Sequence, residues 1–174
     1  VRAALRGFEV NERAPVALRA SMEADLYPRN RPERADLIDG AIGEGSHFHQ
    51  QFGYYAQGVG EDTATLPRGW QKRLVTIKNE NTRGVQGLCL EVHDLALSKY
   101  IAGREKDLDF TRELARQGYT QKATLLERLA TVKTAAPLTR LVQGRIGRDF
   151  RTIYSSPDGA PYIRIEVYEA LCAA

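Results

Sequence analysis

A short predicted strand carries two carboxylates one residue apart, in the segment SMEADLYP at residues 21–28. Side chains at i and i+2 of a strand point to the same face, so Glu23 and Asp25 project together while their apolar neighbours face the other way. Two parallel carboxylates repel each other unless a cation or a proton lies between them. Because Mg²⁺ prefers oxygen ligands, the pair predicts a magnesium site, with a solvated acidic face as the ordinary alternative.

Composition places the chain among ordinary globular proteins. Its 174 residues, 43% of them hydrophobic and 27% charged, suggest one domain or one domain with an appendage. The formal net charge of +3 is compatible with a phosphate-bearing partner but is short of the strong basicity that argues for nucleic acid on its own. The apolar runs are too short to cross a bilayer, and two cysteines, Cys89 and Cys172, fit a reducing cytoplasm.

The periodicity predicts strands in the first half of the chain and helices in the second. Strands are predicted at residues 16–27, 70–77 and 85–92, and a glycine-rich loop followed by a short strand at 43–60. Helices are predicted at residues 1–10, 30–42, from 94 onward, 105–118, 121–132 and 138–154, with an edge strand or tail at 162–168. This order indicates an α+β (mixed α/β) fold.

A group of charged residues follows the third of these strands. If the chain is one continuous helix from Asp94, then Arg104 and Asp107 fall in or beside its apolar face, where a charge is either paired or used. Their spacing of three residues allows them to pair with each other. Lys99 and Lys106 then project to solvent, unless Gly103 breaks the helix and redirects Lys99.

The remaining candidates carry weaker signals. His47 and His49, with His93 further on, make a poor zinc pattern and indicate surface or hydrogen-bonding roles. Tyr54 and Trp70 suit stacking on a nucleobase, with core packing as the ordinary explanation. The glycines at residues 40–60 match neither a Walker loop nor a dinucleotide-binding fingerprint.

Several segments together resemble a known family. They are SMEADLYP at 21–28, FGYYA at 52–56 with Gly58 and Gly60, LPRGW at 66–70, HDLALSK at 93–99 and AGREKD at 102–107. In combination they resemble an uncharacterised bacterial nucleotidyltransferase-like family, a domain of unknown function that is distantly similar to the nucleotidyltransferase toxins of abortive-infection systems. The resemblance covers about residues 15–118. It implies a small mixed sheet flanked by helices at 1–118, without its usual first strand, and a mostly helical C-terminal extension at 119–174.

The resemblance also implies roles for particular residues. Glu23 and Asp25 match the acid pair that binds Mg²⁺, and Lys99 and Asp107 are the best matches to a catalytic lysine and a later aspartate. Glu91 is the nearest candidate for the third carboxylate. The Gly-Ser turn that holds the nucleotide phosphates in such proteins is missing, because VRAA stands at the start of the chain. Either the turn lies upstream or this member has lost it.

The function that follows is Mg²⁺-dependent transfer of a nucleoside monophosphate from a nucleoside triphosphate to an unknown acceptor. RNA, protein and a small molecule stay open as acceptors, and an antitoxin-like partner is a further expectation. Arg104, Lys106 and Tyr54 are the expected substrate-binding residues. Two alternatives stay open. One is a catalytically inactive nucleotidyltransferase-fold module with a binding or regulatory role, and the other is a different Mg²⁺-dependent phosphoryl enzyme such as a nuclease or phosphatase.

Overall fold

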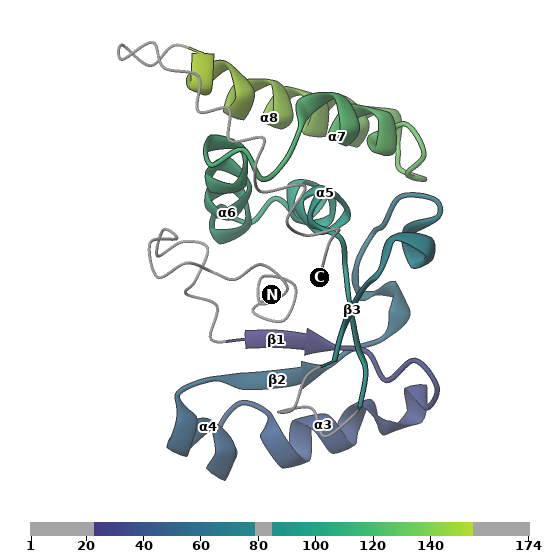
Figure 1. Ribbon diagram of the computed structural model, residues 1–174, viewed down its shortest axis with the longest axis vertical. Helices are drawn as coiled ribbons and strands as arrows, with labels where there is room; N and C mark the ends of the chain where they lie inside the picture. The colour runs from purple at the N-terminus through teal and green to yellow at the C-terminus, as the bar shows by residue number, and fades with distance from the viewer. Residues whose placement is uncertain (1–22, 79–84, 155–174) are drawn as a thin grey trace. The chain divides into compact units, whose positions relative to one another are not determined.

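The computed structural model describes residues 23–78 and 85–154 of the chain (Figure 1). The chain divides into two compact units, residues 1–65 and 66–174, and each unit is described by itself. The described residues form helices and two small sheets, which confirms the predicted α+β class. The predicted helix at 1–10 and the predicted edge strand at 162–168 lie outside the described residues.

The first unit contains a two-stranded parallel sheet. Strand β1 (Glu23–Leu26) pairs with β2 (Tyr55–Gly58), and the connection between them holds the short 3₁₀ helix η1 (Pro32–Arg34), helix α3 (Ala35–Ile42) and helix α4 (His47–Phe52). A second 3₁₀ helix, η2 (Glu61–Thr63), follows β2. Parallel strands need such a crossover because a tight hairpin cannot join them.

Helix α3 packs closely against β2. A Cβ at Gly58 would collide with the backbone carbonyl of Ala35, so the strand and the helix meet at this distance only because residue 58 is glycine. The carboxylate of Asp39 accepts the Gly58 backbone N–H at 2.8 Å. This contact satisfies a donor at the edge of the sheet and ties the two elements together.

Helix α4 corrects the prediction of a loop after Gly43. Ser46 caps this helix by accepting the His49 N–H at 3.1 Å, and Gly53 ends it with a φ of 70°. The sequence therefore carried a start signal and a stop signal for a helix of six residues. The glycine-rich composition around them indicated a loop, and for this segment that prediction was wrong.

The second unit begins with a 3₁₀ helix and a hairpin. Helix η3 (Trp70–Arg73) precedes β3 (Val75–Ile77), which pairs antiparallel with β4 (Gly87–Cys89). Both strands are shorter than the predictions at 70–77 and 85–92. The strand predicted at 70–77 begins only at Val75, because residues 70–73 form a 3₁₀ helix instead of extending.

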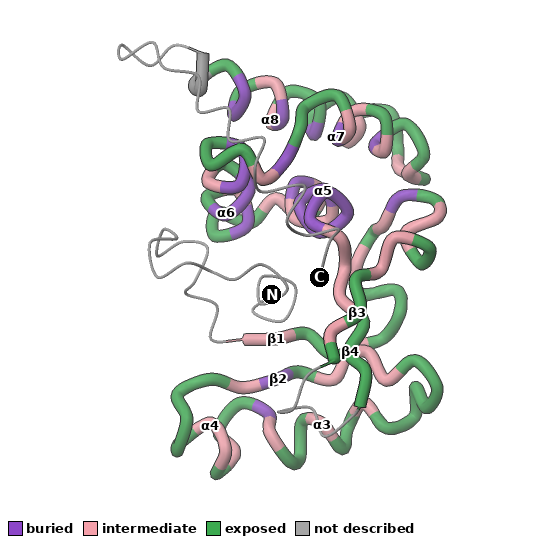
Figure 2. The backbone as a smooth tube through the Cα atoms, in the orientation of Figure 1, coloured by how far each residue is buried: buried purple, intermediate pink, exposed green. Residues whose placement is uncertain are grey.

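Four helices follow in the described part of the second unit: α5 (Val92–Ala102), α6 (Glu105–Arg116), α7 (Lys122–Leu129) and α8 (Ala136–Tyr154). Helix α5 contacts each of the other three and is buried over most of its length, as Figure 2 shows. Ala96 and Leu97 are fully covered. A helix buried on every side loses the polar face of a surface helix, which explains why polar residues of α5 need partners within the protein.

Gly103 separates α5 from α6. It has a φ of 67°, a conformation that residues with a side chain rarely adopt, and its N–H bonds the Lys99 carbonyl to close the end of α5. Of the two alternatives left open for this segment, the structure shows the break at Gly103 and not the continuous helix from Asp94. The chain restarts as α6 at Glu105, which changes the direction of the residues that follow.

Candidate active site

The acid pair lies on one face of the β1–β2 sheet. In the parallel register Glu23 is opposite Tyr55, and Asp25 is opposite Gln57. Paired residues of neighbouring strands share a face, so these four side chains gather on one side of the sheet. The interleaved positions, Ala56 among them, form the other face, and Ala56 is buried.

A depression of about 260 Å³ opens beside this face. Its lining residues are Glu23, Asp39, Glu44, Tyr55 and Gln57, and it is called the acidic depression below. Three of the five carry carboxylates, and none carries a positive charge. Asp25 stands on the same face but outside this lining. A surface built this way attracts cations rather than bare phosphates.

The negative charge around Tyr55 affects the pKa of its hydroxyl. Burial raises the pKa of its hydroxyl, and the carboxylates of Glu23, Glu44 and Asp25 raise it further. The ring of His49 lies 4.8 Å from the ring of Tyr55. Tyr55 is therefore held in its neutral form, in which the hydroxyl is a hydrogen-bond donor.

Tyr54 belongs to an aromatic cluster at the end of α4. Its ring meets the edge of the Phe48 ring at 5.3 Å, and Phe48 in turn lies 4.8 Å from Phe52. Phe52 is half exposed, and Tyr54 is 37% exposed. The cluster presents apolar rings at the surface, an arrangement suited to stacking on a nucleobase.

Lys99, Arg104 and Asp107 form an ion-pair cluster in the second unit. Arg104 Nε donates to Asp107 at 2.6 Å, and Lys99 Nζ lies 3.3 Å from the other oxygen of the same carboxylate. Asp107 is buried, which would raise its pKa, but the two cations outweigh burial and hold the pKa below its ordinary value. The predicted Arg104–Asp107 pairing is confirmed. Of the two alternatives for Lys99, the structure shows the redirected one, because the turn at Gly103 brings Asp107 to it.

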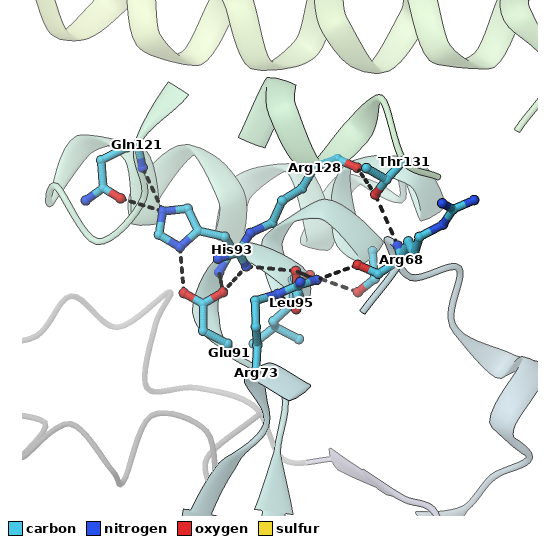
Figure 3. Close-up of polar contacts among 10 residues, drawn as sticks. Arg68, Arg73, Glu91, His93, Leu95, Gln121, Arg128 and Thr131 are labelled. Atoms are coloured by element: carbon cyan, nitrogen blue, oxygen red, sulfur yellow. Dashed lines mark hydrogen bonds and ion pairs between the residues drawn. The ribbon is translucent and has the colours of Figure 1, made fainter. Parts of the chain in front are cut away.

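A second polar network surrounds the start of α5 (Figure 3). Asp94 is fully buried, and Arg73 donates to both of its oxygens at 2.8 and 3.1 Å. Arg128 reaches the same carboxylate at 2.8 Å and also contacts Glu91. The network joins η3, α5 and α7 by charge-assisted hydrogen bonds.

Glu91 caps α5 within this network. Its carboxylate accepts the His93 backbone N–H at 3.2 Å and contacts the His93 ring at 2.6 Å. Burial would raise the pKa of Glu91, but hydrogen bonds from His93 and Arg128 lower it to about 2. The helix therefore begins before Asp94, the predicted start, and Asp94 is the second acid of the network. Both oxygens of Glu91 already have protein partners, and its role as a metal ligand stays a prediction.

His93 is a hydrogen-bonding residue, as predicted. One ring nitrogen meets Glu91, and the other accepts the Gln121 backbone N–H at 3.0 Å. Arg73 and Arg128 were missed by the sequence reading, since they lie 21 and 34 residues from Asp94 and no local pattern connects them. The only sequence signal is their partner, an aspartate in the first turn of a helix that is rich in apolar residues.

Within residues 23–78 and 85–154, no three His, Cys, Asp or Glu side chains are grouped so as to hold a metal ion. Glu23 and Asp25 still suit Mg²⁺, because this ion is commonly held by one or two carboxylates and completes its shell with water and substrate phosphates. The negative charge around Tyr55 also favours a cation at this face. The donor set therefore fits the predicted ion.

Comparison with protein families identifies the class of the chain. Residues 33–137 match the family described as nucleotidyltransferase of unknown function (DUF6036). The match spans more than half of the chain, and the chain belongs to this family. It includes Tyr54, Glu91 and the segment 99–107 but begins after Asp25, so the acid pair lies outside the matched range.

Two further comparisons gave no relative: no curated protein matches the chain, and no solved structure matches it. Over the part of the chain that the structure describes, every helix is too short or too polar to span a bilayer.

Proposed function

We propose that this protein transfers a nucleoside monophosphate from a nucleoside triphosphate to an acceptor in a Mg²⁺-dependent reaction. Membership of the nucleotidyltransferase family supports the class of reaction. The observation that carries the proposal for this chain is the shared face of β1 and β2, on which Glu23, Asp25, Tyr55 and Gln57 stand together beside the acidic depression.

Glu23 and Asp25 are the proposed Mg²⁺ ligands. A bound Mg²⁺ would neutralise the triphosphate and polarise the phosphorus that is attacked. Without a cation, this face would repel a triphosphate. Tyr55 and Gln57 supply neutral donors on the same face, and the raised pKa keeps the Tyr55 hydroxyl protonated, so that it can donate a hydrogen bond to a ribose or phosphate oxygen.

The remaining roles follow the family resemblance. Lys99 and Asp107 are proposed as the catalytic lysine and aspartate, Arg104 and Lys106 as contacts to phosphate, and Tyr54 as a stacking surface for the base. The acceptor, an antitoxin-like partner and a bacterial origin remain predictions from the resemblance. A cytoplasmic location remains a prediction from the two cysteines.

The direct test is transfer of label from α-³²P-labelled nucleoside triphosphates to a mixture of RNA and protein acceptors. The variant is Glu23→Gln with Asp25→Asn, which removes two charges and keeps the side-chain shapes. We expect loss of at least about a hundredfold in transfer, because the metal would have no anionic ligand left. The control, Glu33→Gln with Glu61→Gln, removes two exposed glutamates elsewhere in the first unit and should keep full activity.

A catalytically inactive module is the second candidate. It is favoured by the ion pairs that Lys99 and Arg104 make with Asp107, which give all three residues a role in holding α5 to α6. This candidate predicts Mg²⁺-dependent nucleotide binding by calorimetry without turnover. Binding without transfer would select it, and release of free nucleotides from a nucleic acid substrate would select a nuclease instead.

A further inference from the structure

The outer face of α8 concentrates positive charge. The helix carries four arginines and one aspartate, a net charge of +3 that equals the formal charge of the whole chain. A surface with this local excess attracts polyanions even when the overall charge is modest. The family match ends at residue 137, so most of α8 lies beyond it.

Helical geometry places three of the arginines on one stripe. At 100° per residue, Arg140, Arg148 and Arg151 fall within about a quarter turn of one another, and all three are exposed. The α8 stripe consists of these arginines and the two glycines between them, Arg140, Gly144, Gly147, Arg148 and Arg151. The opposite side of the helix is buried, with Val142 and Ile146 fully covered. The outward side of α8 is exposed in Figure 2.

The acid of α8 offsets only part of the charge of this stripe: Arg148 lies close enough to oppose the rise in pKa that burial causes at Asp149. Asp149 is only 6% exposed and accepts the Tyr100 hydroxyl at 2.8 Å on the inner side of the helix. The fourth arginine is also turned inward, because Arg145 donates to the Tyr100 carbonyl at 2.6 Å. The long-range field of the stripe depends on its summed charge, whichever contacts its arginines make within the chain.

The two glycines of the stripe have no packing reason in the described structure. A Cβ added at Gly144 or Gly147 would meet nothing within 4 Å. Glycine inside a helix is unfavourable relative to alanine because it loses more backbone entropy on folding. Their effect is to leave the helix surface low between the arginines, so that an extended chain can approach the backbone closely.

We propose that the α8 stripe is a docking surface for the phosphate backbone of a nucleic acid strand. Arginine pairs with phosphate through two parallel N–H donors, which suits repeated phosphate contacts. From Arg140 to Arg151 the helix rises about 16 Å, enough to follow several successive phosphates. This surface is separate from the proposed transfer reaction and would bind a strand whether or not the first unit is active.

Two other polyanionic partners fit less well. Insertion into an anionic membrane needs an exposed apolar face, and the apolar face of α8 is buried against α6 and α7. A stable protein interface needs a central apolar or aromatic anchor. The stripe offers none, and only Leu141 beside it is a large exposed apolar residue of α8 whose side chain is described.

The test measures fluorescence anisotropy of a labelled single-stranded RNA of about 20 nucleotides, and a DNA of the same sequence, over a range of salt concentrations. The full chain should bind both, more weakly as salt rises. In the variant Arg140→Gln/Arg148→Gln/Arg151→Gln, affinity should fall by at least about tenfold at 0.1 M salt. The slope of log K against log salt should fall by about 2, since each single-strand phosphate contact contributes about 0.7.

A matched control removes the same charge elsewhere in the second unit. Lys72→Gln/Lys122→Gln/Lys133→Gln replaces three exposed lysines and should change affinity by less than about threefold. The pair Gly144→Ala/Gly147→Ala keeps every charge but raises the surface between the arginines. It should weaken binding by several fold while leaving the circular dichroism spectrum unchanged.

Several results would overturn the proposal. They are failure of the full chain to bind either strand, equal losses in the arginine and lysine variants, or an unchanged salt slope in the arginine variant. Tighter binding to polyglutamate than to RNA and DNA would identify an acidic protein as the partner, and tighter binding to anionic vesicles would identify a membrane. Transfer activity is measured separately with Glu23→Gln/Asp25→Asn, so failure of one proposal leaves the other standing.

Discussion

The two compact units use their charged residues in different ways. In the second unit, Asp94 and Asp107 are buried, and each is held by two cations. In the first unit, acids gather beside a depression that no cation lines. Among the described residues the buried apolar side chains are concentrated in the second unit, and Ala56 represents the first. Charges that stabilise a fold are buried with their partners, whereas acids gathered beside an open depression mark a candidate cation site.

The largest effect expected from this contrast is on the buried network. Asp94→Ala removes the carboxylate shared by Arg73 and Arg128 and leaves two cations without it, which should lower the unfolding free energy by about 3–5 kcal/mol. Asp109→Ala removes an exposed acid paired with Arg112 and should cost less than about 1 kcal/mol. Urea denaturation of both variants measures the difference. Equal losses would show that burial does not distinguish these pairs.

The pH dependence of stability offers a second test of the same network. The pKa of Glu91 is lowered from 4.5 to about 2 in the folded state, so its contribution is present above pH 4.5 and lost as the pH falls toward 2. The shift corresponds to roughly 3 kcal/mol. Glu91→Gln should be less stable at neutral pH, and its free energy of unfolding should fall less steeply than that of the wild type between pH 5 and 2. If the free energy of unfolding of the variant falls as steeply as that of the wild type over this range, Glu91 does not stabilise the fold through this network.

Glycine-to-alanine substitutions distinguish openly packed from closely packed positions in the two units. Alanine at Gly144 and Gly147 should raise the unfolding free energy by about 0.5–1 kcal/mol each, because the space around both is open. Alanine at Gly58 should lower it, because the new Cβ would collide with Ala35. Thermal denaturation of the three variants gives the sign of each change. A loss at residues 144 and 147 would mean that something covers α8.

The smallest expected effect concerns the acid pair. Glu23→Gln with Asp25→Asn should change the unfolding free energy by less than about 1 kcal/mol, or raise it slightly, since two like charges on one strand face repel each other. Chemical denaturation without Mg²⁺ measures this. A loss as large as that of Asp94→Ala would mean that the acids hold the first unit together and would break the comparison.

Local signals predicted much of the fold. Helices α6, α7 and α8 were found within a few residues by their apolar periodicity, and Gly103 was identified as a break. The shared face of Glu23 and Asp25 follows from strand alternation alone. The sequence does not predict helix α4, because its two end signals lie in a glycine-rich stretch. It predicts a strand at η3, because the segment runs on into the β-prone residues Leu74, Val75 and Ile77.

Tertiary contacts could not be predicted in the same way. Lys99 meets Asp107 only because the chain turns at Gly103, and Arg73 and Arg128 reach Asp94 from distant segments. Asp39 and Glu44 line the acidic depression because the connection between β1 and β2 brings them there. Their spacing in the sequence does not predict this position. Helices on both sides of residue 118 pack together in the second unit, and the predicted division at that residue stays a prediction.

Mg²⁺-dependent transfer of an α-phosphorus label is the measurement that bears most directly on the role given to the first unit. Wild type and the Glu33→Gln/Glu61→Gln control should label an acceptor equally, and Glu23→Gln/Asp25→Asn should lose at least about a hundredfold while remaining folded. Labelling that persists in the folded acid-pair variant would contradict the assignment of these two carboxylates to the metal.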